Sequence, residues 1–363
     1  MKFSRRSLVT SGAAALAGLS ASQVLKSRPS VAQANAPSRV AQAGGDFINL
    51  YSSRHYNTDD ELYDNFKRLT GIQVNLLEGS ADELLGRLKI EGSSSPADVF
   101  MTVDAGRLWA ADQEGFFSPV SSSILEEKIP ASLRHPNGHW FGFSKRARVI
   151  MYNKAQVNPA ELSTYEALTD PKWRSQILIR SSSNIYNLSL MASLISIHGS
   201  GETEDWARGL VANFARPPEG NDTAQIRALA SGLGGIAIAN SYYLARLGKS
   251  GDAVDRDIFS KVGLFFPNQG SNQRGTHVNV SGAGVIASSP RKANAIKFLE
   301  YMASPTAQVF FAQGNNEYPV VDGTPLDPVV ADFGSFKSDT VNVEMYGRNQ
   351  AEAVRIADRV GWV

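Results

Sequence analysis

The sequence contains no cysteine. Disulfides, thiolate zinc sites, iron–sulfur clusters and cysteine nucleophiles are therefore excluded, and no cysteine is present to carry an N-terminal lipid anchor. Any bound metal must be held by oxygen and nitrogen atoms. The chain also has no G-x-S-x-G nucleophile elbow and no H-E-x-x-H zinc motif, so two common enzyme signatures are missing.

Long apolar runs are scarce as well. The run LVTSGAAALAGL (8–19) is mild and short, whereas a membrane-spanning helix needs about 20 strongly apolar residues. The pair Arg5-Arg6 precedes this run, and small-residue A-x-A sites follow it at 32–34 and 41–43. This order predicts a twin-arginine export signal over residues 1–43, removed on export, and hence a periplasmic protein.

Acidic residues are absent from residues 1–43, which hold six of the 36 lysines and arginines. The rest of the chain has 30 basic and 35 acidic residues, a net charge of −5. An acidic body argues against nucleic acid or an anionic membrane surface as the main partner.

Strand and helix patterns alternate along most of the chain. In the first block we expect strands at 46–53, 72–79 and 97–104, and helices at 57–71, 80–92 and around Trp109. A turn at Asn137-Gly138 then leads into a long crossing strand. In the second block we expect strands at 175–182, 234–240 and 277–289, and helices at 184–199, around Trp206, at 241–248 and at 291–314 with a break at Ser304-Pro305. Two such blocks predict an α/β fold with parallel-rich sheets and two lobes around a cleft.

Four of the 11 tyrosines and one histidine follow three of the predicted strands. They are His55 and Tyr56, then Tyr186, then Tyr242 and Tyr243. Adjacent side chains do not share a face of a helix or strand, so Tyr242 and Tyr243 cannot both pack into one core. Ligands of open parallel sheets bind beyond the carboxyl ends of the strands. We therefore expect these side chains to line a ligand site.

Three classes of ligand suit a group of phenols. A sugar would stack on the rings, a quaternary amine would occupy an aromatic cage, and a trivalent cation would displace the phenol protons. Ligation by oxygen and imidazole suits iron. Four phenolates around a trivalent ion leave a charge of about −1. Arg54, or Arg246 one turn beyond Tyr243, is placed to balance it.

Two short motifs are the most specific part of the sequence: SSRHY (52–56) and the double tyrosine of NSYYLAR (240–246). Together with INLYSSRHYNTDDELYDNFKRLTGIQVN (48–75), PADVFMTVDAGRLWAADQEG (96–115) and GVIASSPRKANAIKFLEYMASPTAQ (284–308), they carry a resemblance over nearly the whole mature chain. The chain resembles the ferric-iron-binding proteins that serve ABC transporters, and most of all the cyanobacterial members that need no synergistic anion.

The resemblance implies a two-lobed periplasmic binding protein of type II, with iron bound in the cleft between the lobes. The implied ferric ligands are Tyr56, Tyr186, Tyr242 and Tyr243, with His55 as the fifth. The implied N-lobe is 46–144 with 275–323, the C-lobe is 145–274 with 324–363, and strands near 144–152 and 273–280 form the hinge. Relatives that borrow an anion supply a carboxylate, to which Ser80-Ala81-Asp82 is only an approximate match, so we expect binding without an obligatory anion.

The function implied by the resemblance is capture of Fe³⁺ in the periplasm and delivery to an inner-membrane ABC permease. We expect a monomer and no enzymatic activity. The alternatives are a binding protein for a small organic or oxyanion ligand, an iron-sequestering stress protein, and an iron oxidase or phenolate-iron dioxygenase. Five protein ligands would leave little open coordination for the substrate of such an enzyme.

Two further motifs are set aside. His135-x3-His139 has the spacing of a metal site, but Pro136 and Asn137-Gly138 break any helix between the two histidines. Without a helix, this spacing does not place both rings on one face. The glycine-rich stretch GLGG (232–235) precedes a predicted strand instead of following one, so we expect a turn and not a phosphate-binding loop.

Overall fold

The computed structural model describes residues 46–54, 56 and 58–363. The predicted export signal over 1–43 and the predicted ligand His55 lie outside these residues. Within the described ranges, no helix is both long and apolar enough to cross a membrane.

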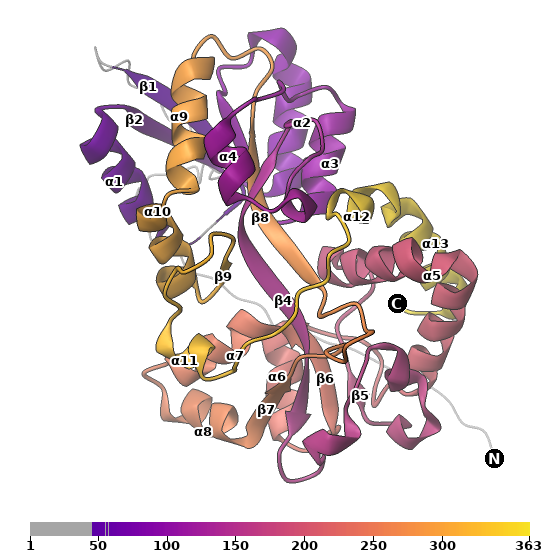
Figure 1. The fold of residues 1–363 in the computed structure, drawn as a ribbon. Coiled ribbons are helices and arrows are strands. Elements are labelled where there is room, and N and C mark those ends of the chain that lie inside the picture. The colour runs from indigo at the N-terminus through magenta and orange to yellow at the C-terminus, as the bar shows by residue number, and fades with distance from the viewer. Residues whose placement is uncertain (1–45, 55, 57) are drawn as a thin grey trace, which may run out of the picture. The chain divides into compact units, whose positions relative to one another are not determined.

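Nine strands and thirteen α-helices are found in the described part of the chain (Figure 1). The strands are β1 (Phe47–Ser52), β2 (Gln73–Glu78), β3 (Val99–Thr102), β4 (Phe141–Asn153), β5 (Ile177–Leu178), β6 (Ile236–Asn240), β7 (Val262–Phe265), β8 (Val278–Val285) and β9 (Tyr318–Pro319). The first seven helices are α1 (Asp59–Thr70), α2 (Ala81–Glu91), α3 (Ala105–Gln113), α4 (Ser123–Lys128), α5 (Ile185–Ala212), α6 (Asp222–Ala230) and α7 (Ser241–Gly248). The others are α8 (Ala253–Lys261), α9 (Lys292–Met302), α10 (Pro305–Val309), α11 (Pro328–Ala331), α12 (Glu344–Arg348) and α13 (Gln350–Val360).

The strands form one mixed sheet in the order β2-β1-β3-β8-β4-β6-β5, with β7 and β9 also paired to β4. β1 is parallel to β2 and β3, and β5 is parallel to β6, as the alternation of strands and helices predicts. β8 and β4 are antiparallel to their neighbours. The sheet is therefore parallel at both ends and antiparallel in the middle.

The long strand β4 belongs to both halves of the sheet. Its first half, Phe141–Ala147, pairs with β8, and its second half, Arg148–Asn153, pairs with β6 and β7. Figure 1 shows β4 and β8 running side by side between the two groups of helices. The predicted lobe boundaries stay a prediction, but a strand shared by both groups is what such a hinge requires.

Local sequence signals set most helix ends. Ser80 and Glu83 form a reciprocal capping box at the start of α2, which satisfies two otherwise unpaired backbone N–H groups. α1 ends at Gly71, which has φ +75, a conformation that costs glycine little. Within α5, Gly199 has φ 78 and ψ 172, so the chain is kinked between the two helices that the sequence predicts there.

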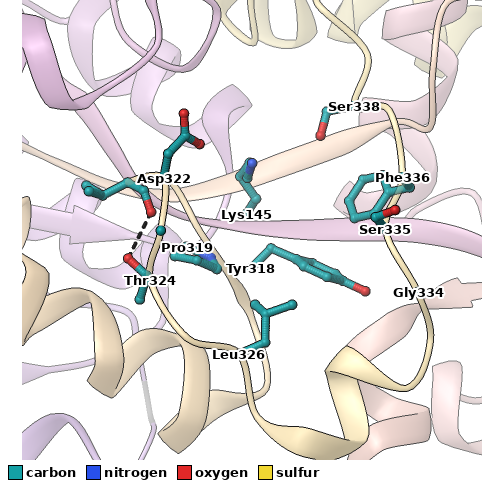
Figure 2. A pocket seen from close by; sticks show the side chains of 12 residues that line it. Lys145, Tyr318, Pro319, Asp322, Thr324, Leu326, Gly334, Ser335, Phe336 and Ser338 are labelled. Atoms are coloured by element: carbon teal, nitrogen blue, oxygen red, sulfur yellow. Dashed lines mark hydrogen bonds between the residues drawn. The ribbon is translucent and has the colours of Figure 1, made fainter.

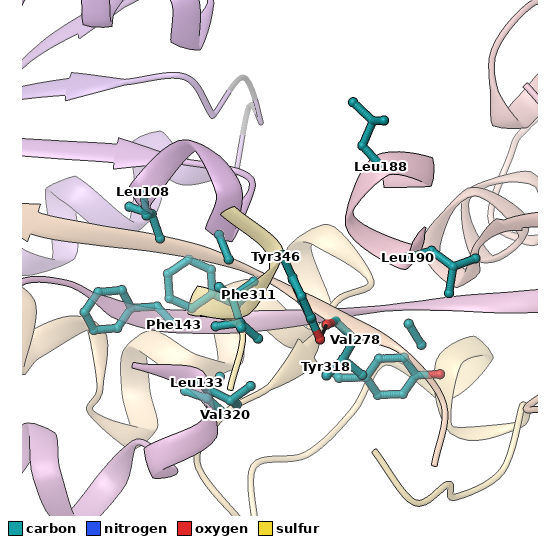
Figure 3. Close-up of a cluster of buried hydrophobic side chains, with 14 of the residues drawn as sticks. Leu108, Leu133, Phe143, Leu188, Leu190, Val278, Phe311, Tyr318, Val320 and Tyr346 are labelled. Atoms are coloured by element: carbon teal, nitrogen blue, oxygen red, sulfur yellow. Dashed lines mark hydrogen bonds between the residues drawn. The ribbon is translucent and has the colours of Figure 1, made fainter. Parts of the chain in front are cut away.

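The core surrounds the antiparallel middle of the sheet. Every residue of β8 is buried. Figure 3 shows Phe143 of β4 and Val278 of β8 among side chains from the helices, and the hydroxyl of Tyr346 in α12 donates to the carbonyl of Val278 at 3.0 Å. Each buried aliphatic or aromatic side chain of this kind contributes about 1.5–3 kcal/mol. The core therefore fixes β4 and β8 firmly.

Candidate metal centre

The predicted site tyrosines lie at strand-to-helix junctions, as expected. Tyr56 lies between β1 and α1 and Tyr186 in the first turn of α5, while Tyr242 and Tyr243 lie in the first turn of α7, directly after β6. Helix N-termini carry a partial positive charge that favours anionic groups. The sequence could not establish whether these junctions meet in space, and the structure answers that question.

The four phenols converge. The hydroxyl oxygens of Tyr242 and Tyr186 are 3.4 Å apart, and the rings of Tyr242 and Tyr243 have centroids 4.3 Å apart. The guanidinium carbon of Arg246 lies 5.2 Å from the ring centroid of Tyr56, 4.8 Å from that of Tyr242 and 5.9 Å from that of Tyr243. One exposed arginine thus contacts rings from two of the three junctions; that it balances phenolate charge stays a prediction.

Arg54, the other arginine singled out from the sequence, is paired with two carboxylates and also contacts the ring of Tyr56. Its side chain is fully buried and forms a two-pronged ion pair with Asp59, at 2.9 and 3.2 Å. A third hydrogen bond, of 3.2 Å, reaches Glu317. Its guanidinium carbon lies 4.6 Å from the ring centroid of Tyr56. Two carboxylates therefore share the charge of Arg54, and Tyr56 packs on its face.

Glu317 was missed by sequence reasoning. Its buried carboxylate accepts hydrogen bonds from the hydroxyl of Tyr56 at 3.3 Å, from the hydroxyl of Ser144 at 2.6 Å and from Arg54 at 3.2 Å. A buried charge needs such partners. No local signal marks this residue, because it lies in the irregular stretch before β9, 261 positions from Tyr56.

Arg146 on β4 was missed as well. Its guanidinium carbon lies 5.6 Å from the ring centroid of Tyr186, and the residue is 2% exposed. Nη2 donates to the carbonyls of Val103 and Val280, while Nε and Nη1 have no hydrogen-bond partner among the residues that the structure describes. A buried cation with open donors beside a phenol favours an anion there.

A signal for this arginine did exist in the sequence. Arg146 and Arg148 stand two positions apart in a long, mostly buried strand, so both point to one face of the sheet. Nη2 of Arg148 bonds Asn187 at 2.6 Å, and Nη1 bonds Asn240 at 3.0 Å. These asparagines stand just beyond Tyr186 and just before α7. Arg148 therefore ties together the two helix starts that carry three of the tyrosines.

Burial favours the protonated phenols of Tyr56, Tyr242 and Tyr243 while no cation is bound. Burial is the largest cause that raises the pKa of Tyr242, with further increases from the neighbouring phenols, and burial also raises the pKa of Tyr243. The pKa of Tyr56 is raised first by burial and then by the Glu317 carboxylate, while Arg54 and Arg146 oppose the increase. A cation bound here would have to displace protons from neutral phenols.

One cavity borders the tyrosine group, and another lies on the opposite face of β4. The first, of about 340 Å³, is bordered by Tyr186 and by Asp82 and Arg107, which approach from α2 and α3. The other, of about 330 Å³, is lined by Lys145, Tyr318 and other residues of the chain beyond β9 (Figure 2). Because side chains alternate along a strand, Lys145 faces this second cavity while its neighbour Arg146 faces the tyrosines.

A strand shared by two halves of a mixed sheet, with candidate ligands at the strand ends, is the arrangement of a two-lobed binding protein. Residues 94–333 match the protein-family model described as bacterial extracellular solute-binding protein. The chain belongs to this family. Its fold is that of a type II periplasmic binding protein, so the fold class predicted from the sequence is confirmed.

Relatives cover nearly the whole chain. Iron uptake protein A2 of Synechocystis is 60% identical over 329 residues, which are 91% of this chain and 93% of that protein. A structure of the Trichodesmium IdiA (FutA) protein in complex with iron and citrate matches 87% of this chain and 100% of its own, with 62% identity and a TM-score of 0.85. A ferric binding protein from Campylobacter jejuni matches 87% of this chain and 100% of its own, with 41% identity and a TM-score of 0.80.

Proposed function

We propose that the chain binds ferric iron through Tyr56, Tyr186, Tyr242 and Tyr243, with His55 as a fifth ligand. The observation that carries this proposal is the convergence of four phenols from three separate junctions: Arg246 contacts the rings of Tyr56, Tyr242 and Tyr243, and the hydroxyl of Tyr186 lies 3.4 Å from that of Tyr242. Phenolates are hard anionic ligands suited to a trivalent ion. The relatives named for iron uptake and ferric binding support the same choice of metal.

Binding exchanges protons for iron. Each phenol that becomes a ligand gives up its proton, so a trivalent ion with four phenolates carries a charge of about −1. Arg246 contacts the ring of Tyr242, and Arg146 lies 5.6 Å from the ring centroid of Tyr186 with two nitrogens free to donate. Both cations would therefore stabilise that charge. Asp82, the approximate match to the carboxylate of relatives that borrow an anion, has a largely exposed side chain that lies 4.0 Å from Arg107. We therefore keep the prediction that no borrowed anion is obligatory.

The physiological role that we propose is capture of iron in the periplasm, after twin-arginine export, and delivery by a monomer to an inner-membrane ABC permease. Tyr56 and His55 would stand on one lobe and the other three ligands on the second, so that closure completes the site. Reduction or protonation would weaken the phenolate bonds and release the iron. A protein that only sequesters iron would share this site and differ in location and partners.

Two other functions would use the same phenols differently. An organic or oxyanion ligand would be held by the rings and Arg146, without loss of phenol protons. An iron oxidase or dioxygenase would need open coordination for its substrate, of which five protein ligands leave little. We therefore infer a binding protein and not an enzyme.

The test is a visible absorption titration of the purified protein with chelated ferric iron at neutral pH. Binding should produce a broad phenolate-to-iron charge-transfer band that saturates at one equivalent, and Tyr242→Phe should abolish or strongly weaken it. Tyr152→Phe, on β4 outside the four-tyrosine group, is the matched control. If no band appears at neutral pH, the tyrosines are not iron ligands, and organic and oxyanion ligands should be tested next.

A further inference from the structure

A second group of metal-ligating side chains lies on other elements of the chain. Asp112 is near the end of α3, and His135 and His139 flank the turn before β4. No helix joins the two histidines, as their sequence predicts. The turn joins them instead: the N–H of Gly138 donates to the carbonyl of His135 at 3.0 Å. The two imidazoles stack, with ring centroids 4.6 Å apart and an interplanar angle of 10°.

The ligand atoms of these three residues point to a common position. Nε2 of His135 lies 3.5 Å from Oδ2 of Asp112, and Nδ1 of His139 contacts the other oxygen of the same carboxylate. One ligand atom from each residue lies within 4.8 Å of the others. Zinc–ligand bonds of 2.0–2.2 Å in a tetrahedron separate neighbouring ligand atoms by about 3.3 to 3.6 Å. The distance between His135 and Asp112 is in this range.

The orientation of the His135 ring is fixed by a contact with the backbone of the turn. Its Nδ1 accepts a hydrogen bond from the backbone N–H of Asn137 at 3.1 Å. Nδ1 is therefore unprotonated in the metal-free protein, and Nε2 carries the ring proton and points toward the carboxylate. A metal bound at Nε2 would displace this proton, and the ring would have to take a proton at Nδ1 and give up the contact with Asn137 to adopt the usual tautomer of a metal-binding imidazole.

A further carboxylate stands close by. Oε1 of Glu344, in α12, lies 3.7 Å from Nε2 of His135 and is held by Arg348 at 2.7 and 2.9 Å. The side chains of His135 and Asp112 are 6% and 9% exposed, whereas that of His139 is 28% exposed. Solvent thus reaches the group from the side of His139, while the other ligands are shielded.

We propose that Asp112, His135 and His139 form a site for a divalent cation of the zinc type, with Glu344 or water as the fourth ligand. Two imidazoles and a carboxylate are borderline ligands that suit divalent transition metals, in contrast to the hard phenolates of the ferric site. The two sites share no residue. Bound metal would join α3, the 135–139 turn and α12.

The experiment measures Zn²⁺ binding to the full-length protein by equilibrium dialysis with elemental analysis, and Co²⁺ binding by visible spectroscopy. Wild type and the ferric-site variant Tyr242→Phe should each bind one equivalent of Zn²⁺ at this site, and ferric loading should not displace it. His139→Ala and the isosteric Asp112→Asn should weaken binding at least about 10-fold and remove the intense visible bands of tetrahedral Co²⁺.

The matched control is His198→Ala. His198 also lies beside two carboxylates, but Glu166 approaches its Nε2 at 3.1 Å and Glu202 approaches its Nδ1 at 3.7 Å. These acids lie on opposite sides of one ring and cannot share an ion with it, so zinc binding should be unchanged. Unchanged affinity in both His139→Ala and Asp112→Asn would overturn the proposal, as would loss of zinc in Tyr242→Phe. If His139→Ala does not fold, as judged by circular dichroism, Asp112→Asn alone decides.

Discussion

The hydroxyl of Tyr56 donates a hydrogen bond of 3.3 Å to Glu317, a buried carboxylate that also neutralises Arg54. A candidate iron ligand is thereby joined to a charge network that combines its neighbours Arg54 and Asp59 with Glu317, 261 positions away. This link has consequences for both stability and binding, and they can be measured separately.

The first prediction concerns stability. Glu317→Gln keeps the size of the side chain but removes the charge that faces Arg54, and both side chains of this pair are fully buried. Asp59 still pairs with Arg54 in this variant, so the loss is that of charge-assisted hydrogen bonds, and the free energy of unfolding should fall by about 1.5–3 kcal/mol. Urea unfolding of the iron-free protein checks this. Asp257→Asn, which breaks the exposed pair with Lys261, should leave the unfolding midpoint unchanged.

The second prediction concerns Arg146. Arg146 opposes the increase in the pKa of Tyr56 and Tyr242, so Arg146→Gln should make their deprotonation harder. The charge-transfer band of the ferric complex should then form at a pH about one unit higher. Lys145→Gln, on the opposite face of β4, is the control and should leave this pH unchanged. Equal shifts in both variants would mean that net charge, and not contact with the phenols, controls binding.

The third prediction concerns the iron-free protein at alkaline pH. Tyrosine in the unfolded chain ionises near 10.0, whereas burial raises the pKa of Tyr56 and Tyr242 above this value in the folded state. The folded state therefore binds more protons than the unfolded state above pH 10, so stability is full below that pH and falls as pH rises further. Urea unfolding between pH 8 and pH 11 should show this decline. A flat profile would show that the phenols ionise freely in the folded protein.

The fourth prediction separates the two metal sites. His135→Ala removes a candidate zinc ligand that takes no part in the phenol group, so the ferric titration should keep its stoichiometry and band position. Tyr243→Phe should do the reverse, with weakened iron binding and unchanged zinc binding. A loss of the iron band in His135→Ala in a folded protein would contradict the separation.

The strand-end tyrosines could be found from sequence because the signal is local. A short apolar strand followed by a helix start places Tyr186 and Tyr242 at the ligand-binding edge of a sheet whatever the rest of the fold. The sequence also predicted the helix break at Ser304-Pro305, and α9 ends at Met302 while α10 begins at Pro305.

Other parts of the site could not be found in this way. Glu317 and Tyr56 meet only because β9 pairs with β4, a long-range contact without a local pattern. The spacing of His135 and His139 matches a helix, but a turn and not a helix brings the two rings together. No sequence pattern for such stacking across a turn is available. The antiparallel middle of the sheet was likewise hidden, since alternating strands and helices predict parallel pairing only.

Arg148 holds Asn187 and Asn240 with one guanidinium, and these residues adjoin the starts of the two helices that carry Tyr186, Tyr242 and Tyr243. The spacing between three phenols is therefore set by a buried side chain and not by a loop that must order itself. Such preorganisation reduces the conformational entropy that is lost at this half of the site when an ion arrives. The speed of capture should then depend on how fast the incoming iron sheds its own chelator.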